Sequence, residues 1–196
     1  MNFLAHLYLS GSDHGLIVGN LLGDFVKGRL RGDYPVAIER GIELHRRIDS
    51  FSSLNTHFLL SKRRIDPSFG HYRGVMVDLF YDHFLSKQWS DYSDIGFNMF
   101  ISNTRMIVEE YRNFLPERLK PLIPYIFSEL LPSYREIAGI SRALVRMSAR
   151  LKRINRLGDG GVELEGNYNE LRGDFHQFFP QLSDFVAVWK ENISAL

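Results

Sequence analysis

The sequence predicts an all-α fold. Apolar residues recur with the helical period along most of the chain, and no series of alternating strands is present. Prolines and glycines divide the chain into segments of helical length. With 196 residues, 44% of them hydrophobic and 13% aromatic, the chain can bury a substantial core. We therefore expect one helical-bundle domain over residues 1–196.

The first three expected helices contain most of the polar residues discussed below. One helix contains Leu16 to Phe25 and ends near Gly28. A second begins at Pro35, because proline suits the first turn of a helix, and continues past Ile48. The third extends from Gly70 to Trp89.

Four helices are expected in the remainder of the chain, over 93–114, 117–131, 133–156 and 168–194. The boundaries or kinks between them are marked by Pro116, Pro121, Pro124 and Pro132. The glycine-rich segment from Gly158 to Gly166 is expected to be a loop.

Composition limits the chemistry that this chain can perform. There is no cysteine, so disulfides, thiolate zinc sites and a cysteine nucleophile are excluded. A metal ion would need histidine, carboxylate or water ligands. The formal net charge of +1 argues against general polyanion binding, and no nucleic-acid motif is present. The N-terminus makes a poor signal peptide and no apolar run is long enough for a membrane span, so we expect a cytoplasmic protein.

The most informative segment is the apolar stretch from Val75 to Leu85, which contains Asp78, Asp82 and His83. The two carboxylates are four residues apart and therefore share one face of a helix. Buried carboxylates are costly unless they are paired, hydrogen-bonded or bound to a metal. A hard divalent cation is the explanation that we favour.

Two other expected helices have polar pairs of the same spacing, and a lone histidine precedes them. Asn20 and Asp24 form one pair, His45 and Asp49 the other, and His6 is the lone histidine. A helical bundle can direct such pairs into one metal-binding cavity. Each residue also has an ordinary interpretation: His6 as a core histidine, Asp24 paired with a nearby lysine, or His45 hydrogen-bonded to Asp49.

A basic segment follows later in the chain. It extends from Ser141 to Arg156 with six basic residues and no acidic one. The arginines expected to follow helical spacing are Arg142, Arg146, Arg150 and Arg153. A solvated amphipathic helix would account for this pattern, and so would a surface for an acidic partner or a phosphate group.

At these residues the chain resembles the acyl carrier protein phosphodiesterase family, whose members remove 4′-phosphopantetheine from holo-acyl carrier protein. The matching segments run from Met1 to Leu7, from Gly19 to Gly28, from Gly41 to Asp49 and from Asp78 to Trp89. The segment Phe175–Leu182 is also similar. This family is a divergent relative of the all-α HD-type metal-dependent phosphohydrolases, so an HD-like helical bundle is expected. The chain has Asp82-His83, however, where the HD pattern has histidine before aspartate.

The resemblance implies a divalent ion, with Mn²⁺ favoured and Mg²⁺ or Fe²⁺ as alternatives. The expected metal ligands are Asp24, His45, Asp78 and Asp82. We expect His6 or His83 to be a further ligand or the general acid, and Asp49 to orient an imidazole. Substrate binding is assigned to Asn20, Arg46 and the basic segment, through Arg142, Arg146, Arg150 and Arg153.

The expected partner is acyl carrier protein, an acidic protein substrate. Two other functions remain open at this point. One is an HD-like phosphohydrolase acting on a small nucleotide or phosphate ester with the same metal site. The other is a non-catalytic helical binding module, whose histidine and aspartate pairs would be structural.

Overall fold

The computed structural model describes residues 3–194, and these form α-helices, short 3₁₀ and π turns and loops, with no β-strand among them. The prediction of an all-α fold is confirmed. The predicted extent of 1–196 includes residues 1–2 and 195–196, which lie outside the described part. The described chain divides into two compact units: unit 1 comprises 51–88 and 133–194, and unit 2 comprises 3–50 and 89–132.

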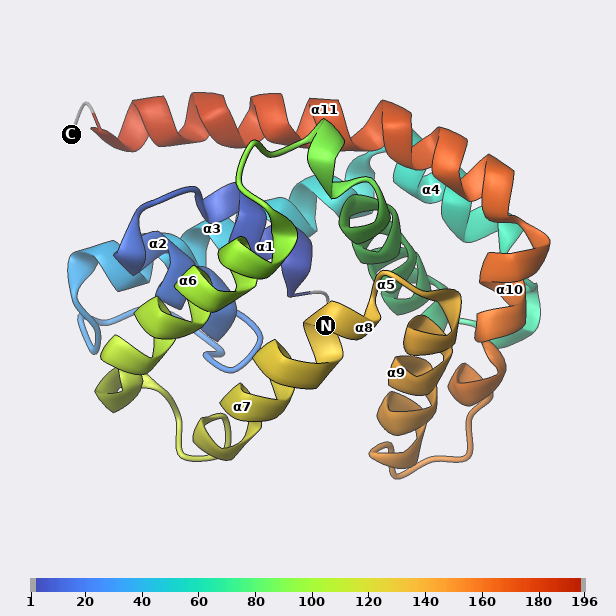
Figure 1. Ribbon diagram of the computed structural model, residues 1–196, viewed down its shortest axis with the longest axis horizontal. Coiled ribbons are helices and arrows are strands. Elements are labelled where there is room, and N and C mark those ends of the chain that lie inside the picture. The colour runs from blue at the N-terminus through green and yellow to red at the C-terminus, as the bar shows by residue number, and fades with distance from the viewer. Residues whose placement is uncertain (1–2, 195–196) are drawn as a thin grey trace. The chain divides into compact units, whose positions relative to one another are not determined.

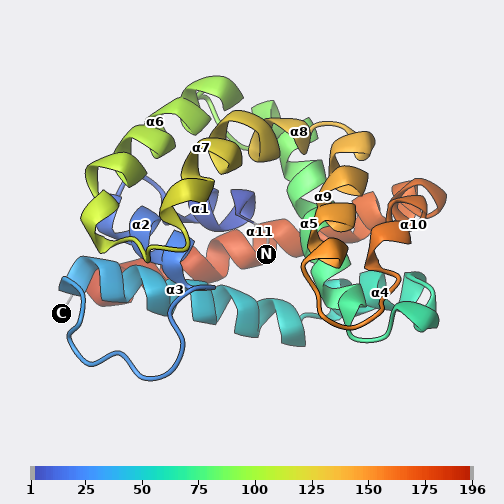
Figure 2. The ribbon, with the colours of Figure 1, turned by 90° about the horizontal axis from the view of Figure 1, so that it is seen from below.

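Unit 2 contains α1 (Leu4–Ser10), α2 (His14–Leu22), most of α3 (Val36–Leu54) and α6 (Phe97–Glu110). Helix α2 packs against both α1 and α6, as can be followed in Figure 2. After α6 the chain continues in short elements: η3 (Arg112–Phe114), η4 (Lys120–Leu122), α7 (Ile123–Tyr125), a π turn (Ile126–Leu130) and α8 (Leu131–Ser133). The last four of these follow one another without a gap, so the helix predicted around 117–131 is present over 120–133 with mixed 3₁₀, α and π geometry.

Helices α2 and α3 approach each other at backbone contact distance. A Cβ atom on Gly19 would lie 2.1 Å from the carbonyl oxygen of Ile38, and one on Gly41 would lie 2.7 Å from Cα of Gly19. Real side chains do not tolerate such distances, so the crossing requires glycine on both helices. This close approach brings Asn20 on α2 next to His45 on α3.

Unit 1 is built around α5 (Tyr72–Lys87), which packs against α4 (Thr56–Arg64), α9 (Ile137–Ala149) and α11 (Tyr168–Ser194). Its remaining elements are η1 (Pro67–Phe69), η6 (Leu157–Asp159) and α10 (Gly161–Gly166). Figure 1 shows α4 alongside the N-terminal part of α11. Most of α5 from Met76 to Ser86 is buried, as its apolar sequence predicted.

Two helices end earlier than the sequence predicted. Helix α2 ends at Leu22 because the carbonyl oxygen of Asn20 accepts from Nδ1 of His45 and from the Gly23 amide. Helix α9 ends at Ala149, and Asn155 folds back onto Ser148 just beyond it.

The predicted loop from Gly158 to Gly166 was also wrong, because it contains η6 and α10. Within the described residues, no helix is long and apolar enough to cross a membrane.

Candidate metal centre

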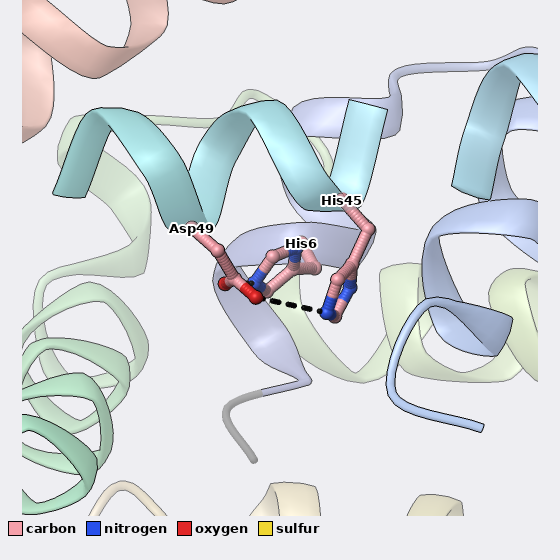
Figure 3. A group of neighbouring side chains, drawn as sticks. All are labelled: His6, His45 and Asp49. Carbon is pink, nitrogen blue, oxygen red and sulfur yellow. Dashed lines mark ion pairs between the residues drawn. The ribbon is translucent and has the colours of Figure 1, made fainter. Parts of the chain in front are cut away.

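Three side chains of unit 2 converge on one point: His6 from α1, and His45 and Asp49 from successive turns of α3 (Figure 3). Nε2 of His6 lies 3.4 Å from Oδ1 of Asp49, and Nε2 of His45 lies 3.3 Å from Oδ2 of the same carboxylate. The two imidazole rings stack with their centroids 4.1 Å apart. Both histidines are buried, whereas the Asp49 side chain is 57% exposed, so the group opens to solvent on the carboxylate side.

Asn20 fixes which nitrogen of His6 carries a proton. Its amide nitrogen donates to the carbonyl oxygen of His6 at 2.8 Å and to the hydroxyl of Ser10 at 3.0 Å. These acceptors determine the orientation of the carboxamide. Oδ1 of Asn20 therefore faces Nδ1 of His6, at 2.7 Å, and that nitrogen must be the donor.

The proton of His45 is fixed in the same way. Its Nδ1 lies 2.9 Å from the backbone oxygen of Asn20, which can only accept. In their neutral forms both imidazoles therefore present an Nε2 lone pair to the carboxylate of Asp49. Three electron-rich groups at such distances repel one another unless a cation lies between them.

A divalent metal ion fits this group better than protons do. Neighbouring ligands of an ion bound at about 2.0–2.1 Å are about 2.9–3.4 Å apart, close to both separations measured here. Within the described structure, Nε2 of His6 is buried and lacks a hydrogen-bond partner. Burial, together with His45, lowers the pKa of His6, so a proton is a poor occupant. Histidine and carboxylate suit Mn²⁺, Fe²⁺ or Zn²⁺.

The Asp49 carboxylate is held in its ionised form. Partial burial acts to raise its pKa, but a proton on the adjacent Nε2 of His45 or His6 would pair with the carboxylate and lower that pKa below the ordinary range. Asp49 therefore supplies a negative charge at the open side of the group. From the sequence, Asp49 was expected to orient a ligating imidazole and not to be a ligand itself. Its oxygens instead face both Nε2 atoms directly.

Asp24 lies at the edge of the same group, and Arg46 follows His45 in α3. Oδ1 of Asp24 is 3.9 Å from Nε2 of His45, close enough for a small adjustment to make it a further ligand. Asp24 lies beyond the end of α2, so it does not share a helical face with Asn20 as predicted. Arg46 donates to the backbone oxygen of Val26 at 3.2 Å.

The His45 side chain packs directly against Gly23, where any larger residue would overlap it. A Cβ atom at this position would lie 2.0 Å from Cγ of His45. Neither Gly23 nor Ser10 was predicted from the sequence to support the site. Gly19 and Gly23 lie one residue before and three residues after Asn20. This spacing was the only sequence signal that either glycine has a structural role.

Asp78, Asp82 and His83 belong to unit 1 and are not members of the three-residue group. Asp82 is fully buried, and Asp78 is partly exposed. Nδ1 of His83 lies 2.8 Å from the carbonyl oxygen of Tyr134, and its Nε2 lies 3.0 Å from the hydroxyl of Tyr168. Burial lowers the pKa of His83, so the ring is neutral near pH 7.

The basic segment is only partly helical. Arg142 and Arg146 are exposed on α9, and Arg150 caps its end. Arg153 lies in the segment beyond the helix, so it does not continue the predicted stripe. Exposed apolar side chains accompany the arginines, namely Val145, Leu151 and Ile154.

Comparison with known proteins agrees with the resemblance seen in the sequence. The family model described as acyl carrier protein phosphodiesterase matches residues 1–182. Proteins named acyl carrier protein phosphodiesterase from Klebsiella pneumoniae (strain 342) and Serratia proteamaculans (strain 568) are 34% and 31% identical to this chain. Each alignment covers 93% of this chain and 95% of the relative. No solved structure matches significantly. The chain belongs to the acyl carrier protein phosphodiesterase family.

Proposed function

We propose that this protein hydrolyses the phosphodiester between serine and 4′-phosphopantetheine in holo-acyl carrier protein, releasing the apo-protein with a free serine hydroxyl. The observation that carries the proposal is the group of two Nε2 atoms and one carboxylate in a member of this family. Such a group suits a phosphodiester, whose negative charge repels nucleophiles until it is neutralised.

His6, His45 and Asp49 would hold the divalent ion, with Asp24 as a further ligand. A bound ion of this kind supplies Lewis acidity toward phosphoryl oxygens and lowers the pKa of water. The Asp49 side chain is 57% exposed, so a phosphate group would approach the ion from this side. Arg46, a half-buried cation on α3, is the residue that we assign to the phosphate oxygens.

The ligand roles of Asp78 and Asp82 stay predictions from the sequence, as does a general-acid role for His83. Substitution of either aspartate by alanine, followed by measurement of bound Mn²⁺, tests the ligand prediction. Unchanged metal content in both variants would confine the centre to the residues of unit 2.

The basic segment of unit 1 is the surface that we assign to the carrier protein. Arg142, Arg146 and Arg153 are exposed, and Ile154 is exposed completely. Arginine interleaved with exposed apolar side chains is typical of protein-binding surfaces. An acidic protein is the partner that such a surface attracts and orients. The cytoplasmic location expected from the sequence is part of this proposal.

Incubation of the purified protein with holo-acyl carrier protein and Mn²⁺ tests the proposal, with intact-mass spectrometry as the readout. We expect loss of the phosphopantetheine mass from the carrier protein and appearance of free 4′-phosphopantetheine. The control is the Asp49→Ala variant at equal concentration. An unchanged holo mass with metal-loaded wild-type protein would contradict the proposal.

A further inference from the structure

We infer that Asn20 is a positioning residue that sets the tautomer of His6 and thereby prepares its Nε2 atom as a metal ligand. The inference rests on the proposed metal centre but concerns a residue outside the ligand set. Asn20 was expected from the sequence to bind substrate, and the inference gives it a role at His6 instead.

The carboxamide of Asn20 is fully engaged inside unit 2. The residue is 1% exposed, and its side chain contacts Nδ1 and the carbonyl oxygen of His6 and the hydroxyl of Ser10. The Ser10 hydroxyl in turn donates to the carbonyl oxygen of His6 at 2.9 Å. A substrate would have to break buried hydrogen bonds to reach this carboxamide.

Asn20 also contacts His45, through its backbone carbonyl group. The carbonyl oxygen of Asn20 accepts from Nδ1 of His45, so a single residue of α2 holds both imidazoles in the Nδ1–H form. Only the contact to His6 depends on the side chain. Substitution of Asn20 should therefore affect the two histidines differently, which a general loss of structure would not do.

The consequence for the metal follows from the chemistry of imidazole. A neutral ring protonated at Nε2 has no lone pair there and cannot ligate at that atom. Groups that hold a ligating histidine in its correct tautomer typically contribute 10–100-fold to metal affinity. We expect a loss of about that size when the carboxamide of Asn20 is removed.

The test is ¹⁵N NMR of the histidine rings in the full-length, metal-free protein, combined with titration of Mn²⁺ followed by the EPR signal of the free ion. In the wild-type protein, His6 and His45 should both be Nδ1–H tautomers. In Asn20→Leu, which keeps the side-chain size, His6 should lose this preference while His45 keeps it. The Mn²⁺ dissociation constant should rise by about 10–100-fold.

Two further variants complete the design. Asn20→Asp retains an acceptor oxygen and should keep His6 in the Nδ1–H form. Asn55→Ala removes the asparagine that caps α4 in unit 1, and it should leave both tautomers and Mn²⁺ binding unchanged.

An Nε2–H form of His6 in the wild-type protein would overturn the inference. So would equal disturbance of both rings in Asn20→Leu, or wild-type Mn²⁺ affinity in that variant. Failure of the wild-type protein to cleave holo-acyl carrier protein would refute the proposed function while leaving the tautomer result intact. The two failures are therefore distinguishable.

Discussion

Substitution of Gly23 by alanine should strongly reduce activity without replacing any proposed metal ligand. The new Cβ atom would lie 2.0 Å from Cγ, 2.4 Å from Cβ and 2.4 Å from Cδ2 of His45. The ring would have to retreat by about 1.4 Å to reach ordinary van der Waals contact. That movement breaks the 2.9 Å hydrogen bond from Nδ1 of His45 to Asn20.

The expected size of the effect follows from this displacement. A misplacement of about 1 Å can cost about 10²-fold in rate, and we expect kcat for holo-acyl carrier protein to fall by about that factor. Overpacking of this kind also costs about 1–3 kcal/mol in the free energy of unfolding. The protein should remain folded, so steady-state kinetics and urea denaturation can be measured on the same preparation.

Gly173→Ala is the matched control. Gly173 is exposed inside α11, and a Cβ atom there would meet nothing within 4 Å. Replacing a helix-interior glycine by alanine should stabilise the protein by about 0.5–1 kcal/mol and leave kcat unchanged. Wild-type kcat and Mn²⁺ affinity in Gly23→Ala would refute the assignment of His45 to the metal centre.

Three other changes give distinct outcomes. Replacement of Arg142, Arg146 and Arg153 by glutamate should raise KM for holo-acyl carrier protein and alter the salt dependence of KM. The rate of hydrolysis of a small chromogenic phosphodiester should stay the same. An equal loss of activity on both substrates would contradict a docking role. Arg64→Ala should lower the free energy of unfolding, measured by urea denaturation, by about 2–4 kcal/mol. The reason is that the Asp174 side chain, which is only 8% exposed, would lose both hydrogen bonds from the guanidinium group. Arg47→Ala is the control, because its ion pair with Glu43 is exposed, and it should cost less than about 1 kcal/mol. Burial lowers the pKa of His6 and of His83 below the ordinary 6.5. As the pH falls, these histidines therefore bind protons in the unfolded chain before they do so in the folded protein, and Tm of the metal-free protein should fall below about pH 6.5. A constant Tm between about pH 7.5 and 5.5 would contradict neutral buried histidines.

The long helices were predictable because their periodicity extends over many residues. The burial of α5 followed from its apolar composition, and α11 occupies the predicted range although it contains Pro180. Helix α4 was missed although its signals were present: Asn55 caps its start, and three basic residues occupy its last turn. Helix α10 was missed because its glycines indicate a loop when local propensity alone is considered.

The candidate metal centre was predictable in part, because one of its pairs has a regular helical spacing. The i, i+4 spacing of His45 and Asp49 is visible in the sequence, and both residues were candidates. The role of His6 depends on the packing of α1 against α2, which no local pattern encodes. The role of Asn20 depends on two contacts, one from its side chain and one from its backbone, to histidines 14 and 25 residues away in the chain.

The central claim is that His6, His45 and Asp49 together hold the divalent ion. Its most direct test is titration of the metal-free protein with Mn²⁺, followed by EPR, in the wild type and in the His6→Gln/Asp49→Ala double variant. We expect saturable binding in the wild type and loss of that binding in the double variant, with the helical circular dichroism retained. Equal Mn²⁺ binding by the two proteins would contradict the account, because the ion would then be held elsewhere.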